Sequence, residues 1–244
     1  MMEVKGNTIL ITGGATGIGF SLAEAFVKAG NEVIICGRRE NKLEEAKNKL
    51  PQIHIKKCDL SEENNRKELF EWASSNFPNL NILVNNAGIQ RKIDLNKGTR
   101  ELFYGEDEIE VNLKAYIHLS AYFIPFLMKK KEAAIINVSS GLGFVPLAIF
   151  PVYCATKAAV HSFSVSLRHQ LRNTPIKVFE IIPPTVNTDL GGGKATGIQP
   201  AEVAETVIKS VEKNEYEIPV GMAQSLRMGA RENPDQAFQN MNKW

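Results

Sequence analysis

The sequence predicts an α/β fold in which one parallel, seven-stranded sheet is covered by helices on both faces. Apolar segments of strand length alternate with segments of helical periodicity along the 244-residue chain. Alternating strands and helices form parallel sheets, and right-handed crossovers then give the doubly wound (Rossmann) arrangement. The expected strands are residues 8–11, 33–36, 53–55, 82–84, 135–138, 178–182 and 216–220, and the expected helices are residues 18–29, 40–49, 62–76, 106–131, 153–172 and 200–213.

The composition is that of a globular protein of one domain. Hydrophobic residues make up 43% of the chain and charged residues 23%, with a net charge of +2 that gives no reason to expect nucleic acid as a partner. No repeat or linker divides residues 1–244, and no apolar run is long enough to predict a membrane span. Three cysteines without metal-ligand spacing indicate a reducing, cytoplasmic setting and no metal site.

A glycine-rich turn follows the first expected strand and opens the first helix. Gly13, Gly17 and Gly19 stand there with Thr16 and Ile18, in the context that a dinucleotide-binding turn requires. Glycine lets the backbone approach a pyrophosphate, and the N–H groups of the new helix face its phosphates. The Gly-x-x-x-Gly-x-Gly spacing differs from the commoner Gly-x-Gly-x-x-Gly, and a plain turn is the alternative.

The second expected strand ends at Gly37, Arg38 and Arg39. An acidic residue usually stands here when the cofactor carries a free ribose 2′-hydroxyl, whereas guanidinium groups suit a 2′-phosphate. The turn therefore favours NADP(H) over NAD(H), although Arg39 also begins a helix and a solvated charged turn is the alternative.

Two further strand ends supply candidate cofactor contacts. Asp59 and Leu60 follow the third strand, where the carboxyl group could meet the adenine edge or cap the helix that begins near residue 61. Asn86, Ala87 and Gly88 follow the fourth strand, where an amide can fix neighbouring loops and glycine leaves room for a ribose. A turn that uses Asn and Gly for its geometry is the other interpretation.

The candidate catalytic residues are Ser140, Tyr153, Lys157 and Asn112. On a helix, Tyr153 and Lys157 lie one turn apart, and an ammonium group beside a phenol favours the phenolate. Such a tyrosine can donate and accept a proton, although a solvated Tyr–Lys pair is the alternative. Ser140 ends the fifth strand beside this helix. Asn112 interrupts an apolar helical stretch and could be only a structural hydrogen-bonding residue.

Together these residues resemble the short-chain dehydrogenase/reductase family over about residues 5–190. The glycine turn, Asn86 to Gly88, Asn112, Ser140 and the Tyr153/Lys157 pair occur in order and at the spacing of its shorter members. The segments 181–190 and 233–242 are similar to a bacterial subgroup, the DltE-like oxidoreductases.

The resemblance implies roles for these residues. Tyr153 would protonate a carbonyl oxygen, Lys157 would lower the pKa of Tyr153 and hold the nicotinamide ribose, and Ser140 would stabilise the developing oxyanion. Asn112 would position a water beside Lys157. Pro183, Val186 and Thr188 would contact the nicotinamide, with the carboxamide on Thr188.

Two positions depart from the family pattern. Pro184 stands where a glycine is usual, which removes a backbone donor near the nicotinamide. Thr16 stands where many NADP-preferring members have a basic residue, so Arg38 and Arg39 would hold the 2′-phosphate.

The expected function is an NADP(H)-dependent oxidoreductase that moves a hydride between nicotinamide and a small carbonyl or alcohol substrate. A non-catalytic NADPH-binding regulator and an isomerase or epimerase of the same fold are the alternatives. Residues 189–200 would cover the substrate, and 221–244 would form a C-terminal tail. A homodimer or homotetramer is expected from apolar residues on several sides of the fourth and fifth helices: Ile117, Leu119, Phe123, Phe126, Val160, Phe163 and Leu167.

Overall fold

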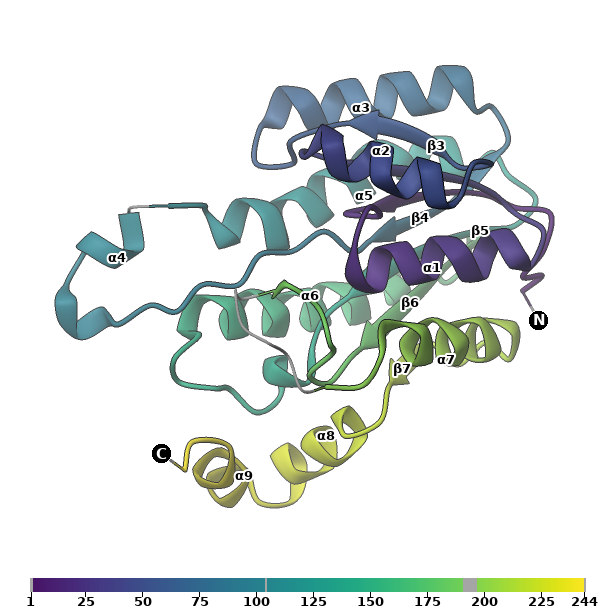
Figure 1. The fold of residues 1–244 in the computed structure, drawn as a ribbon. Helices are drawn as coiled ribbons and strands as arrows, with labels where there is room; N and C mark the ends of the chain where they lie inside the picture. Colours follow the sequence, from purple (N-terminus) through teal and green to yellow (C-terminus); the bar gives the residue numbers. More distant parts are fainter. Residues whose placement is uncertain (1, 104, 191–196, 244) are drawn as a thin grey trace.

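The computed structural model describes residues 2–103, 105–190 and 197–243, and it confirms the predicted fold class. Within these residues, seven parallel strands form one twisted sheet in the order β3-β2-β1-β4-β5-β6-β7 (Figure 1). The strands are β1 (Thr8–Thr12), β2 (Glu32–Gly37), β3 (His54–Lys57), β4 (Leu80–Asn85), β5 (Ala133–Val138), β6 (Ile176–Ile182) and β7 (Glu217–Pro219).

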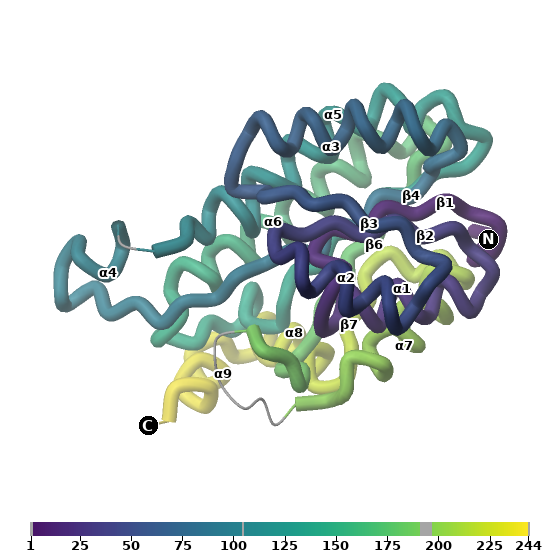
Figure 2. The backbone as a smooth tube through the Cα atoms, turned by 45° about the horizontal axis from the view of Figure 1, so that its top comes forward, coloured from purple at the N-terminus to yellow at the C-terminus, as the bar shows by residue number. Residues whose placement is uncertain are grey.

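Helices connect successive strands and cover the sheet, as the tube in Figure 2 also shows. The main helices are α1 (Gly17–Lys28), α2 (Glu40–Lys49), α3 (Glu63–Asn76), α5 (Ala115–Leu127), α6 (Pro151–Gln170) and α7 (Pro200–Glu212). The shorter elements are η1 (Leu95–Lys97), α4 (Arg100–Phe103), η2 (Glu110–Lys114), η3 (Gly141–Gly143), α8 (Ala223–Glu232) and α9 (Pro234–Met241).

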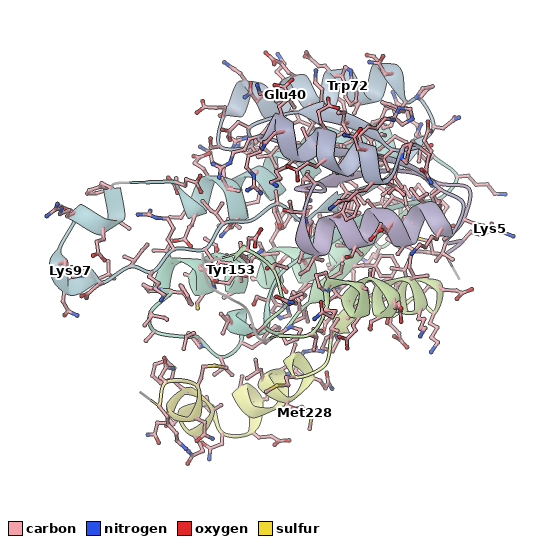
Figure 3. All side chains as sticks on the ribbon, viewed as in Figure 1. Lys5, Glu40, Trp72, Lys97, Tyr153 and Met228 are labelled. Atoms are coloured by element: carbon pink, nitrogen blue, oxygen red, sulfur yellow. The ribbon has the colours of Figure 1, made fainter. Side chains whose placement is uncertain are left out.

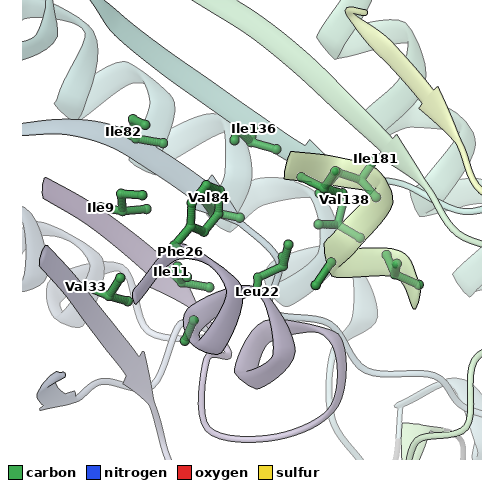
Figure 4. Packing of buried hydrophobic residues seen from close by; sticks show 14 of the residues in the cluster. Ile9, Ile11, Leu22, Phe26, Val33, Ile82, Val84, Ile136, Val138 and Ile181 are labelled. Atoms are coloured by element: carbon green, nitrogen blue, oxygen red, sulfur yellow. The ribbon is translucent and has the colours of Figure 1, made fainter. Parts of the chain in front are cut away.

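The alternation of side chains along each strand builds two separate cores. On β1, Ile9 and Ile11 face one side of the sheet with α1 and α7, whereas Leu10 faces the other side with α3 and α5. Figure 4 shows Leu22 and Phe26 of α1 packed over Ile9, Ile11 and Val84. Each large aliphatic side chain buried in this way contributes about 1.5–3 kcal/mol to folding.

Parallel strands place all their carboxyl ends along one edge of the sheet. The strand order reverses between β1 and β4, because β2 and β3 lie on one side of β1 and β4 to β7 on the other. Ligands of open α/β sheets bind at such a reversal, outside the carboxyl ends of the strands. The predicted site residues at the ends of β1, β2, β4, β5 and β6 therefore converge on one edge.

The structure differs from the predicted elements at three places. The single helix predicted for residues 106–131 is interrupted by the π-helical turn η2, after which α5 runs through Pro125 and ends at Leu127. Residues 95–103, for which no element was predicted, form η1 and α4 on a projecting arm, whose outer end is marked by Lys97 in Figure 3. The predicted tail forms two helices, α8 and α9.

These last two helices pack against the loop that follows β5. A Cβ built on Gly141 would lie 2.8 Å from Leu226 Cδ1 of α8. The side chain of Asn242, just after α9, accepts from the backbone N–H of Ala148 at 2.7 Å and donates to the carbonyl of Pro146 at 3.0 Å. The end of the chain is therefore attached to the segment that begins at Ser140.

Candidate active site

The glycine turn after β1 makes contacts that allow no side chain at two positions. Gly13 has φ +62°, and a Cβ built on it would lie 2.8 Å from Ala87 Cα. A Cβ built on Gly19 would lie 2.3 Å from the carbonyl oxygen of Gly13. The turn thus packs directly on the segment after β4 and keeps the start of α1 close to β1.

Thr12 joins this turn to the end of β4. Its hydroxyl accepts hydrogen bonds from the backbone N–H groups of Asn86 at 2.9 Å and Ala87 at 3.0 Å, and donates to the carbonyl of Val84. The Asn86 amide donates in return to the carbonyls of Thr12 at 2.9 Å and Gly13 at 3.2 Å. Asn86 thereby fixes the neighbouring turn, as its sequence position predicted.

The start of α1 faces the loop after β6. Thr16 precedes the helix in extended conformation and makes no side-chain capping bond, so its hydroxyl leaves the first N–H groups of α1 available. The methyl group of Thr188 lies 3.0 Å from a Cβ built on Gly17. Two further predicted residues of this loop are fixed by backbone contacts, since the carbonyl of Pro183 accepts from Gly141 N and Val186 pairs with Ile198.

Arg38 lines a hollow of about 330 Å³ at the end of β2 together with Lys56, Lys57 and Asp59. Its guanidinium group is also ion-paired with Glu106, which follows the projecting arm, and this partner raises the pKa of Arg38. Both side chains are nearly half exposed. The guanidinium group of Arg38, which was predicted to hold a 2′-phosphate, therefore lies at this hollow and is already paired with the carboxylate of Glu106.

Asp59 and Arg39 make local contacts. Asp59 Oδ1 accepts from the N–H of Ser61 at 3.0 Å and from its hydroxyl at 2.8 Å, which forms a local turn ahead of α3. The helix-capping role that the sequence left open is not seen, because α3 has Glu62 at its N-cap and no side-chain capping bond. Leu60 is buried beside it. Arg39 is the residue before α2, and its charge adds to the hydrogen bond from Lys42 that lowers the pKa of Glu45.

The four candidate catalytic residues are all buried and lie on three neighbouring elements: η2, the end of β5 and α6. Tyr153 lies in the middle of the molecule in Figure 3, and the ammonium nitrogen of Lys157 is 5.7 Å from the centre of its ring. Ser140 interacts with the Tyr153 side chain, and its Oγ accepts from the N–H of Leu142 at 3.1 Å. Lys157 Nζ donates to the carbonyl of Val138 at 2.8 Å.

Asn112 connects η2 to α6. Its side chain accepts from the N–H of Ile89 at 2.8 Å, and donates to the Ile89 carbonyl at 2.9 Å and to Thr156 Oγ1 at 3.2 Å. A Cβ built on Gly88 would lie 3.4 Å from Asn112 Oδ1 and 3.7 Å from Lys157 Nζ. π-Helical turns of this kind occur often at functional sites. The hydrogen bonds of Asn112 to Ile89 and Thr156 show the structural hydrogen-bonding role that the sequence left open. They place Asn112 near Lys157.

Burial dominates the electrostatics of the candidate catalytic pair, Tyr153 and Lys157. It raises the pKa of Tyr153 to about 12, although the hydrogen bond with Ser140 opposes the rise. It lowers the pKa of Lys157 to about 7, against the attraction of Glu180. The sequence predicted that Lys157 would lower the pKa of Tyr153. In this structure the pKa of Tyr153 instead lies above its usual value, because removal from water disfavours both charged forms.

The structure adds residues that the sequence analysis did not select. Thr12 is one, and Tyr116 is another: its hydroxyl donates to the carbonyl of Ala87 at 3.0 Å, and Lys157 Nζ lies 5.4 Å from its ring centre. Tyr116 stands four residues after Asn112, on the same side of the helix, and this spacing was the available signal. Of the predicted substrate-covering segment 189–200, residues 191–196 lie outside the described residues.

Comparison with known proteins places the chain in a family. Residues 7–198 match the family described as short chain dehydrogenase. The chain is 51% identical to the uncharacterized oxidoreductase DltE of Bacillus subtilis, over 99% of this chain and 98% of that protein. It is 32% identical to the NADP-dependent 3-hydroxy acid dehydrogenase YdfG of Escherichia coli K12, over 73% of this chain and 72% of YdfG. The protein belongs to the short-chain dehydrogenase family.

Solved structures share this fold. A short chain dehydrogenase/reductase of Burkholderia phymatum in complex with NAD matches with a TM-score of 0.84 at 20% identity, and 97% of each chain is covered. The closed form of a serine dehydrogenase complexed with NADP+ matches with a TM-score of 0.75 at 28% identity, over 84% of this chain and 88% of the other. Both resemble the Rossmann-type arrangement described above, and both were solved with a dinucleotide.

None of the helices in the described ranges has the length and apolar character needed to cross a membrane.

Proposed function

We propose that the protein is an NADP(H)-dependent oxidoreductase that interconverts a small carbonyl compound and the corresponding alcohol. The observation that carries the proposal is the grouping of Ser140, Tyr153, Lys157 and Asn112 at the carboxyl edge of the sheet, beside the glycine turn. The residues at this edge suit the dinucleotide: Gly13 and Gly19 allow close approach of a pyrophosphate, and α1 offers its N-terminal N–H groups.

The cofactor would lie along the ends of the strands. Gly13, Thr16, Gly17, Ile18 and Gly19 would contact its phosphates, Asp59 and Leu60 its adenine, and Asn86, Ala87 and Gly88 its ribose. Pro183, Val186 and Thr188 would contact the nicotinamide, whose carboxamide Thr188 would bind. When bound, NADPH supplies the hydride for the carbonyl carbon.

The chain's own residues would manage the proton. Tyr153 would donate its hydroxyl proton to the carbonyl oxygen, and Ser140 would donate a hydrogen bond to the same oxygen as negative charge develops. An ammonium at Lys157 would favour the resulting phenolate. Asn112 would hold a water through which Lys157 exchanges protons with solvent.

The choice of NADP(H) rests on Arg38, with Arg39 as a possible second contact. A guanidinium can hold two phosphate oxygens at once, and Gly37 presents no carboxylate to repel a phosphate. The names of YdfG and of the serine dehydrogenase structure mention NADP, whereas the Burkholderia phymatum structure contains NAD. The proposal therefore depends on the residues of this chain and is tested on them.

The test is oxidation of NADPH, followed by absorbance, across a panel of aldehydes, ketones and 3-oxoacyl compounds. We expect turnover with at least one class, and Tyr153→Phe should reduce kcat by about 10²–10⁴-fold while NADPH still binds. Tyr122→Phe removes a hydroxyl from α5, where the ring stacks on Phe70, and should retain activity. Near-normal turnover of Tyr153→Phe would reject the mechanism.

The same assay separates the alternatives. A regulator would bind NADPH without oxidising it in the presence of any carbonyl compound. An isomerase or epimerase would convert its substrate with no net change in cofactor absorbance. The burial of Tyr153 beside Ser140 favours the oxidoreductase, since a pure sensor of NADPH has no need of a proton donor.

The setting and assembly are part of the proposal. Cys36, Cys58 and Cys154 are all buried free thiols, which supports a reducing cytoplasm. A homodimer or homotetramer is supported by apolar residues that α5 and α6 expose to solvent, of which Ile117 and Val165 are the largest.

A further inference from the structure

A carboxylate lies fully buried in the middle of β6. Glu180 has an exposed fraction of 0% within the apolar strand segment Ile176–Ile182. One oxygen accepts from the hydroxyl of Ser139 at 2.5 Å, and the other lies 2.8 Å from Nδ1 of His161. A buried charge costs several kcal/mol unless partners compensate it, so its presence in this strand calls for a role.

The partners of Glu180 are adjacent to the proposed catalytic residues. Ser139 precedes Ser140 and follows Val138, whose carbonyl accepts from Lys157 Nζ at 2.8 Å. His161 follows Lys157 by one turn of α6, and its ring lies 4.7 Å from that of Phe144 in the loop after Ser140. Glu180 therefore joins the end of β5 to the helix that carries Tyr153 and Lys157.

The charges around Glu180 come from three elements. Lys157, His161 and Arg168 lie on α6, Arg227 lies on α8, and Glu217 lies opposite Glu180 on β7. Glu217 is ion-paired with both Arg168 and Arg227, so the two arginines already have a carboxylate. Glu180 contacts His161 directly, and its charge also acts on Lys157, Arg168 and Arg227.

We propose that Glu180 is a positioning residue of the active site: its charge favours the ammonium form of Lys157, and its bond to Ser139 fixes the strand end from which Ser140 projects. The inference rests on the function proposed above for Lys157 and Ser140. The electrostatic part of the inference agrees with the causes of the Lys157 pKa. Burial lowers this pKa, and the negative charge of Glu180 opposes the lowering.

Direct titration of the lysine amine tests the electrostatic part without any cofactor. Lysine labelled at Cε is followed by NMR between pH 5 and 11 in the cofactor-free protein, and the Lys157 signal is assigned by its loss in Lys157→Met. In Glu180→Gln the midpoint should fall by about one pH unit or more. In Glu132→Gln, a control at the opposite end of β5 and β6 where the carboxylate pairs with Lys177, it should stay at the wild-type value.

A second variant covers the case in which Glu180→Gln does not fold. His161→Gln keeps the carboxylate and removes the imidazole, and His161 is partly exposed. The Lys157 midpoint should then stay at or above its wild-type value. A lower midpoint would overturn the inference, because the imidazole and not the carboxylate would be supporting the ammonium. An unchanged midpoint in folded Glu180→Gln would overturn it as well.

Kinetics then separate this inference from the proposed function. If wild-type protein reduces a carbonyl substrate, the alkaline limb of kcat/KM should move to lower pH in Glu180→Gln and stay in place in Glu132→Gln. If no carbonyl compound is reduced but the Lys157 midpoint still moves as expected, the proposed function fails and the electrostatic role of Glu180 stands. If the protein is active and Glu180→Gln moves neither the alkaline limb of kcat/KM nor the Lys157 midpoint, the role of Glu180 is rejected and the proposed function stands.

Discussion

Lys157 and Tyr153 illustrate, at the scale of the residue, how strongly burial governs this site. Lys157 is 3% exposed and Tyr153 is 5% exposed. Removal from water stabilises the neutral form of each, which separates their pKa values to about 7 and about 12. The sequence predicted that the two residues lie one turn apart on a helix, and both lie on α6. It could not predict the direction of the tyrosine shift, because the depth of burial depends on the surrounding elements.

Lys157→Met should increase the stability of the protein most at low pH. The pKa of Lys157 falls from an ordinary value of 10.5 to about 7 on folding. The folded state therefore binds fewer protons between these values, and the unfolding free energy of the wild type rises with pH across that window. Below pH 7 the full cost of the buried amine is present, so we expect a gain of roughly 3–5 kcal/mol at pH 6 that shrinks towards pH 10.

Urea denaturation at several pH values measures this gain. Lys209→Met, on an exposed position of α7, is the control and should show no comparable trend. A gain for Lys157→Met that is equal at pH 6 and pH 10 would contradict the argument.

Glu106→Gln should raise the affinity for NADPH. In the structure the carboxylate of Glu106 is the ion-pair partner of Arg38, so a 2′-phosphate would have to replace it. Because the two side chains are about 44–45% exposed, the pair contributes little. We expect a decrease in Kd for NADPH of about 1.4- to fivefold, from about 0.2–1 kcal/mol for an exposed ion pair. Kd for NADH should not change.

Fluorescence titration with both cofactors is the measurement. Glu110→Gln serves as the control, because Glu110 is ion-paired with Arg66 and Lys114 and not with Arg38. An equal gain for NADH and NADPH would show that Glu106 does not compete with the phosphate. Arg38 and Glu106 lie far apart in the sequence, so this pairing could not be expected from either segment.

At the scale of the element, the junction between β1 and β4 depends on one hydroxyl group. Thr12 is fully buried and accepts from two backbone N–H groups. Thr12→Val keeps the shape and leaves both donors without an acceptor, which should lower the unfolding free energy by about 2–4 kcal/mol. Two fully buried unsatisfied groups would cost about 2–6 kcal/mol, and these two N–H groups are only partly buried.

Thermal and urea denaturation check this value, with Thr8→Val on the same strand as the control. The hydroxyl of Thr8 donates to Glu32, a side chain that retains access to solvent. Loss of the Thr8 hydroxyl should therefore lower the unfolding free energy by well under half of the decrease expected for Thr12→Val. Equal effects of the two substitutions would mean that β-strand packing, and not the two N–H groups, determines the result.

The elements that the sequence predicted well are those with strong local signals. The central strands are dense in Ile and Val, and their predicted limits agree with the structure within a few residues. The arm that contains η1 and α4 has short, polar elements held by ion pairs such as Lys97–Glu101, and these leave no apolar periodicity. The π-helical turn at Asn112 depends on bonds to Ile89 and Thr156 from other elements.

At the scale of the whole molecule, α5 and α6 leave apolar faces exposed. Ile117, Ala121 and Pro125 are exposed at one-turn intervals on α5, and Ala158 and Val165 at two-turn spacing on α6. Small side chains allow two helices to approach closely. Other residues predicted for such an interface are buried within the chain, including Leu119, Phe123, Val160 and Leu167. The sequence could not divide the apolar residues between the core and a subunit contact.

Val165→Arg should shift the protein from an oligomer to a monomer at micromolar concentration. An arginine on this face would meet its symmetry mate in an isologous interface, where like charges repel. Light scattering measures the mass, and Ala201→Arg on an exposed position of α7 is the control. A monomeric wild type would refute the proposed assembly, and an unchanged mass for Val165→Arg would exclude this face.

The contact of α8 and α9 with the loop after β5 has a consequence for the order of synthesis. Leu226 and Asn242 follow every proposed catalytic residue in the chain, yet they contact Gly141 and the 146–148 segment beside Ser140. As the chain emerges from the ribosome, the glycine turn, Tyr153 and Lys157 are all available before this support exists. A nascent chain can therefore acquire its dinucleotide-binding edge first, and the loop next to Ser140 reaches its final position only when α9 has been made.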